Sequence, residues 1–138
     1  MRRVPTTLAS LLFVVFAAPP LTASVMSDFQ ARLAQTQWNI QSVEGMVRAQ
    51  RASSRAMATP EAIESFLDLL TGNVGALTAF SSAKVTTDQG RVIAEGIRST
   101  AGQLRDLSAM ISHRGFSSAA AETQRLEANC RVAIADTD

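Results

Sequence analysis

Chemically reactive side chains are scarce in this sequence. It contains one cysteine, Cys130, and one histidine, His113, so a zinc site built from histidine and cysteine lacks the donors it needs. The residues Ala128-Asn129-Cys130-Arg131-Val132 also lack the second cysteine and the histidine of a covalent haem attachment motif. Cys130 falls on the apolar side of an expected helix, and we interpret it as an inert core thiol. The alternative is an intermolecular disulfide, which an oxidising compartment allows.

His113 is the one candidate for a haem-iron ligand. In the expected fold Met57 lies at the same end of the molecule and offers a second axial ligand. However, His113 lies off the apolar seam of its helix, and a place in the last turn, beside the exposed carbonyl groups, accounts for it. We therefore expect no cofactor. The alternative function is a carrier that holds haem or another small apolar ligand between its helices, where Gly72, Gly75 and the run Ala119-Ala120-Ala121 leave room.

The acidic residues do not form a pattern typical of catalysis. They are spread along polar faces beside arginines, as in Glu44 with Arg48 and Glu127 with Arg131, at the spacing of helical ion pairs. The sequence has neither a glycine-rich phosphate loop nor the Glu-x-x-His pairs of a di-iron bundle. We therefore predict no catalytic residue and no metal site, and expect that the protein is not an enzyme.

A basic and an acidic triplet lie on either side of one expected helix connection. The basic set is Arg48, Arg51 and Arg55, and the acidic set is Glu61, Glu64 and Asp68. If the two helices form a hairpin, the triplets run past each other, and we expect a surface ion ladder in which each pair contributes about 0–1 kcal/mol. The alternative for the arginines is a site for an anion or a lipid headgroup.

The N-terminal 23 residues have the three parts of a secretory signal peptide. Basic Met1-Arg2-Arg3 precedes the apolar run Leu8–Ala18, and small residues around Ala23 offer a cleavage site. The apolar run is short for a membrane span, so we expect cleavage after Ala23 rather than an uncleaved anchor, and no stable span afterwards. We expect the product to be periplasmic, or secreted beyond the periplasm, and the preference for arginine over lysine is typical of GC-rich bacterial genomes.

The charge balance gives no electrostatic reason for nucleic-acid binding. The chain carries 13 basic and 12 acidic residues, and loss of Arg2 and Arg3 with the signal leaves 11 against 12, a net charge of −1. Nucleic-acid binding needs a basic surface, which this balance does not provide.

The mature residues 24–138 are predicted to form one all-α domain. Apolar residues recur at alternating intervals of three and four, and no stretch alternates with a period of two. Thr86 with Gln89 has the spacing of a capping box, and Gly115 is placed to end a helix. Gly72 and Gly75 mark either a close crossing or a local break. The predicted fold is an antiparallel up-down-up-down four-helix bundle, with helices at about 25–58, 60–81, 87–114 and 118–135.

The first helix carries the residues that we expect to bind a partner. It is longer than the second, so its apolar seam is predicted to extend past its neighbour, and Trp38 points to the opposite face. The alternative is that the third helix or the connection Ser81–Val85 covers this strip. The sequence therefore predicts a non-catalytic exported bundle that associates with another envelope protein or with itself, through Met26, Phe29, Leu33 and Trp38.

Overall fold

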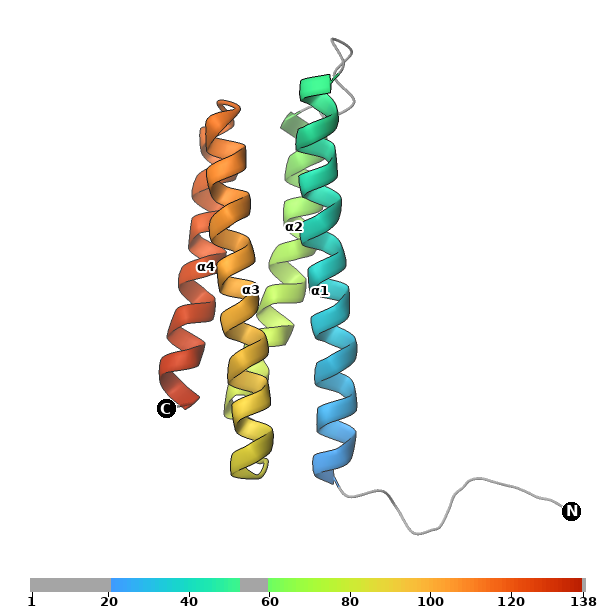
Figure 1. Cartoon of the computed structure of the whole chain (residues 1–138), viewed down its shortest axis with the longest axis vertical. Coiled ribbons are helices and arrows are strands. Elements are labelled where there is room, and N and C mark those ends of the chain that lie inside the picture. The colour runs from blue at the N-terminus through green and yellow to red at the C-terminus, as the bar shows by residue number, and fades with distance from the viewer. Residues whose placement is uncertain (1–20, 53–59, 138) are drawn as a thin grey trace, which may run out of the picture.

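The chain forms four helices that pack against one another (Figure 1). The computed structural model describes the backbone of residues 21–52 and 60–137 and the side chains of residues 24–49 and 61–135. Among these residues there is no strand, so the predicted all-α class with four helices is confirmed. The elements are α1 (Leu21–Ala52), α2 (Pro60–Thr78), the short 3₁₀ helix η1 (Ala79–Ser82), α3 (Thr87–His113) and α4 (Ser117–Thr137).

The limits of α3 and α4 lie within two residues of the predicted ones, and the predicted end of the first helix at residue 58 lies outside the described residues. α1 begins at Leu21, before the predicted start at residue 25, and α2 passes into η1 after Thr78 instead of continuing to residue 81. Residues 1–20 of the predicted signal peptide, and Arg55 and Met57 of the predicted first helix, lie outside the described residues. Within the described helices, none is both long and apolar enough to cross a membrane.

Each helix packs against two neighbours. α1 packs against α2 and α3, and α4 packs against the same two helices. The most extensive contact joins α3 to α4, where small side chains let the two helices approach closely. Ala101 of α3 and Ala119, Ala120 and Ala133 of α4 are all buried. Figure 1 shows α3 and α4 side by side, with α1 beyond α3.

The predicted seams form the core. In α1 the buried residues follow the heptad spacing through Phe29, Ile40, Val43 and Val47, and α3 contributes an equally regular set from Ile93 to Ile111. Three buried threonines interrupt these apolar rows, and each hydroxyl donates to the carbonyl four residues earlier at 2.8 or 2.9 Å. Those bonds leave no threonine hydroxyl of the set unpaired in the core. The three are Thr36, Thr100 and Thr123.

Both predicted helix-end signals are confirmed. The Thr86 hydroxyl accepts the backbone N–H of Gln89 at 3.2 Å, and the Gln89 side chain accepts the backbone N–H of Thr86 at 3.0 Å. At the other end of α3, Gly115 has a φ of 87°, which favours glycine. The N–H groups of Gly115 and Phe116 donate to the carbonyls of Ser112 and Ile111, the two bonds of a Schellman motif.

The glycine that permits a close helix crossing is Gly96. A Cβ on Gly96 would lie 2.7 Å from Cζ of Phe29 and 3.2 Å from Cδ2 of Leu33, so α1 and α3 need glycine at this point. The prediction for Gly72 and Gly75 is wrong on both counts. α2 continues through them, and a Cβ on either residue would meet nothing within 4 Å.

Candidate functional site

The apolar strip predicted on α1 is covered for most of its length. Phe29 is fully buried, and its ring meets that of Phe80 edge to face with centroids 5.5 Å apart. Met26 and Leu33 are half-buried and pack against the core. Phe29 is therefore not available for surface contact in this structure, because η1 and the first turns of α3 cover the strip that α1 extends past α2.

Trp38 has the orientation that the sequence predicts. Its side chain is 62% exposed, on the side of α1 that faces away from the core. No charged side chain of α1 is fully exposed between Asp28 and Arg48, since Arg32 and Glu44 are both half-buried. Trp38 thus stands on an uncharged surface.

The uncharged surface continues onto α2. The sequence has no charged residue between Asp68 and Lys84. Leu69 is 60% exposed and lies, by helical spacing, on the same side of α2 as Asn73 and Ala76, which face α1. We call this surface the hairpin face and define it by Ala31, Gln35, Trp38 and Ser42 of α1 and by Leu69, Gly72 and Ala76 of α2.

A groove opens in the hairpin face on the N-terminal side of Trp38, from Asp28 to Gln35 of α1. Its volume is about 380 Å³, and its walls come from both helices and from η1. The Arg32 side chain is held there, because its Nη1 donates to Oδ1 of Asn73 at 2.8 Å and to Oε1 of Gln35 at 3.4 Å. The groove therefore presents a positioned guanidinium between small and aromatic side chains. Its lining residues are Asp28, Ala31, Arg32, Gln35, Ala76 and Phe80.

A buried amide pair supports the groove from below. Asn39 of α1 and Asn73 of α2 are both buried, and Nδ2 of Asn73 donates to Oδ1 of Asn39. With Arg32 they form a polar ladder across the α1–α2 interface. Buried polar pairs of this kind fix the register of two helices, because a shifted register leaves amides unpaired. Periodicity along one helix does not reveal the pair, although an asparagine next to the seam residue Ile40 is a local signal for it.

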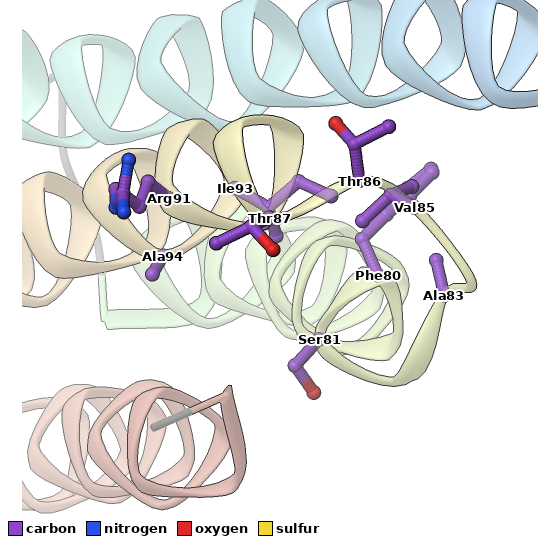
Figure 2. A pocket seen from close by; sticks show the side chains of 10 residues that line it. Phe80, Ser81, Ala83, Val85, Thr86, Thr87, Arg91, Ile93 and Ala94 are labelled. Atoms are coloured by element: carbon purple, nitrogen blue, oxygen red, sulfur yellow. The ribbon is translucent and has the colours of Figure 1, made fainter.

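A second groove, of about 510 Å³, lies where the chain passes from η1 into α3 (Figure 2). Two of its polar side chains are held by local bonds. Thr86 is bonded within the capping box, and the guanidinium of Arg91 pairs with Asp88 at 2.8 Å in full exposure to solvent. Besides these groups, the groove is lined by the hydroxyls of Ser81 and Thr87, and Arg91 is its only charged lining residue.

Of the predicted ion ladder between α1 and α2, only the pairs to Arg48 fall within the described side chains, and none of them forms. Glu64 and Asp68 line a groove with Glu122 of α4 instead, and within the described side chains no ion pair joins them to Arg48. The reason is geometric: the side of α2 that faces α1 carries Asn73 and Ala76, whereas the acidic stripe lies towards α4. Arg51 and Arg55 lie outside the described side chains. The pair Glu127 and Arg131 does form, at 2.9 Å.

The two most reactive side chain types in the sequence, Cys130 and His113, occupy positions that structure alone explains. Cys130 is completely buried, and burial raises the pKa of its thiol to about 11, with the carboxylate of Glu127 adding to the rise and Arg131 opposing it. This agrees with a core thiol. His113 is exposed in the last turn of α3, off the seam. In the described part of the chain, no three histidine, cysteine or acidic side chains gather in a way that could hold a metal ion.

The residues proposed to leave room for a ligand do not surround a space. Gly72 and Gly75 face solvent, and Ala119 and Ala120 are packed into the core. Comparison with protein-family models, curated proteins and solved structures finds no match for this chain. The strongest site by geometry is therefore the hairpin face, where the exposed Trp38 lies one helical turn from Gln35 of the groove.

Proposed function

We propose that this protein is a non-catalytic, exported helical bundle that works by binding another protein through the hairpin face. The observation that carries the proposal is the 62% exposure of Trp38 on a face whose defining residues are all uncharged. Tryptophan is enriched among residues that dominate interface energetics, and the centres of interfaces are depleted in charge. Trp38 is retained from the predicted set as the anchor, whereas Met26 and Leu33 pack against the core and Phe29 is buried within it.

The destination and the topology belong to the same proposal. The basic start, apolar run and small residues of positions 1–23 support a cleaved signal peptide and delivery to the periplasm or beyond. An up-down-up-down order is supported by the single-glycine turn between α3 and α4, because short connections favour antiparallel neighbours. The partner is another envelope protein or a second copy of the chain.

Site-specific photo-cross-linking in the cells that produce the protein tests the proposal. A benzophenone amino acid replaces Gln41, which is exposed on α1 one turn from Trp38. We expect an ultraviolet-dependent adduct, and we expect Trp38→Ala in the same chain to remove it because the anchor is gone. Mass spectrometry of the adduct identifies the bound protein.

The matched control places the same cross-linker at Asn129, an exposed position on α4. We expect no specific adduct there. Absence of an adduct from position 41, or the same adducts from both positions, would contradict binding through the hairpin face.

A further inference from the structure

We propose that the occupant of the hairpin face is a second copy of this chain, with Trp38 of each copy seated in the groove of the other. This inference rests on the proposed function and names its partner. The hairpin face carries both a projecting side chain, Trp38, and a groove. Two-fold contacts are self-complementary, so a protein that carries both features on the same face can bind itself twice in one interface.

The spacing of the two features suits a two-fold axis. Ala31, which lines the groove, lies seven residues from Trp38 on the same side of α1, about 10 Å along the helix. Helical side chains lean towards the N-terminus, so the indole is directed towards the groove end of the face. An axis near Gln35 with the two α1 helices antiparallel brings each Trp38 over the groove of its partner.

The groove has the chemistry to receive an indole ring. Its volume of about 380 Å³ falls within the range of small-molecule pockets. The aromatic Phe80 and the small Ala31 and Ala76 form an apolar wall. The Arg32 guanidinium, held by Asn73, is positioned to stack on the incoming ring, a cation–π contact for which tryptophan is the best aromatic partner.

The charge distribution favours a second copy over a charged partner. Near a two-fold axis each residue lies opposite the same residue of the other copy, so an exposed charge there would face a like charge and be repelled. The residues that define the hairpin face include no charged side chain, and the two charged residues that line its groove, Asp28 and Arg32, have opposite signs. The outer faces of α3 and α4 carry many charges, among them Arg98, Arg105, Asp106 and Arg125. A two-fold contact between two copies through these faces would bring like charges together.

The size of the face predicts a weak dimer. The stretch Ala31–Gly45 is about 21 Å long, and two neighbouring helices are about 20 Å wide. The flat area of the face on each copy is therefore about 400 Å², to which the projecting Trp38 and the walls of the groove add. Standard interfaces take about 800 Å² from each partner. We therefore expect exchange between monomer and dimer in the micromolar range or above.

Sedimentation equilibrium of the purified protein, from micromolar to millimolar concentration, measures this exchange. Trp38→Ala should raise the dissociation constant by roughly thirtyfold or more, as truncation of a central anchor does. Ala76→Arg should raise it similarly by filling the groove while leaving Trp38 in place. Val132→Ala is the matched control, since Val132 is 63% exposed but lies on α4, and should have no effect.

A disulfide trap tests the position of the axis. Gln35→Cys should oxidise to a covalent dimer, because the two copies of residue 35 meet at the axis, whereas Asn129→Cys should not. Cys130 does not interfere because it is buried. A monomer at every concentration, a dimer that Trp38→Ala leaves intact, or equal trapping at both positions overturns the second-copy inference. If Gln41 still cross-links to a different protein, the proposed function survives that result; if it cross-links to nothing, the proposed function fails as well.

Discussion

The ring of Phe29 occupies the space that a side chain at Gly96 would need. The two residues lie on α1 and α3, and a Cβ on Gly96 would come within 2.7 Å of Cζ and 3.1 Å of Cε2 of the ring. Because Phe29 is fully buried and its ring also meets Phe80, it has no free direction in which to move. The approach of α1 to α3 therefore depends on one missing methyl group.

Gly96→Ala should destabilise the fold, although alanine is the better helix former. Overpacking costs about 1–3 kcal/mol, and the gain in helix propensity returns up to about 1 kcal/mol of it. Urea unfolding followed by circular dichroism measures the difference. Gly75→Ala in α2 is the matched control, because a Cβ there meets nothing within 4 Å, and should stabilise by about 0.5–1 kcal/mol. Stabilisation by both changes would contradict the close approach.

The Asn39–Asn73 pair should show strong coupling in a double-mutant cycle. Asn73→Leu leaves the buried Oδ1 of Asn39 without its donor and removes an acceptor from Arg32, at a cost of about 1–3 kcal/mol. Asn39→Leu strands Nδ2 of Asn73 in the same way. The double variant removes both amides, so its loss of unfolding free energy should be smaller than the sum of the two single losses. Strict additivity would show that the pair does not act as a unit.

Local features of this fold are well predicted from the sequence. Helical periodicity is a property of one segment, so it finds the seam residues Ile40 and Val43, and it also finds that Trp38 faces outward. The capping box at Thr86 and the glycine at position 115 are equally local, since each depends on backbone groups within a few residues.

Features that depend on two helices are not predicted in this way. Periodicity does not say which neighbour each side of a helix contacts. The sequence therefore predicts that the acidic stripe at Glu64 faces α1, whereas in the structure it faces α4. The burial of Phe29 has the same cause, because the residues that cover it come from η1 and α3. The groove beside Trp38 also needs two helices, and no spacing within α1 predicts its walls.

Gly115→Ala should weaken the turn between α3 and α4. The residue holds a φ of 87°, and a side chain in that left-handed conformation costs about 1–2 kcal/mol. Gly102→Ala is the control, because Gly102 lies within α3 and a Cβ on it meets nothing within 4 Å. Urea midpoints should fall for the first variant and rise for the second. Equal midpoints would mean that the turn adapts to a side chain without loss.

Cys130 should be almost unreactive in the folded protein. The thiolate is the reactive form, and burial raises the pKa of this thiol from 9.0 to about 11. A thiol reagent such as Ellman's reagent, applied at pH 8, should therefore label the native protein far more slowly than the protein in urea. Rapid labelling of the native protein would contradict the buried position in α4.

The same pKa shift predicts how stability changes with pH. A group whose pKa is higher in the folded state than in the unfolded state stabilises the fold fully below the unfolded value, here 9.0, and loses that contribution as the pH rises to about 11. The loss for Cys130 is roughly 2–3 kcal/mol across this window. Cys130→Ala removes the titrating thiol, so its unfolding free energy should fall less steeply between pH 9 and pH 11 than that of the natural chain. The comparison uses slopes with pH because the smaller side chain also lowers stability at every pH by leaving a cavity. Parallel slopes in the two proteins would show that the thiol does not titrate differently on folding.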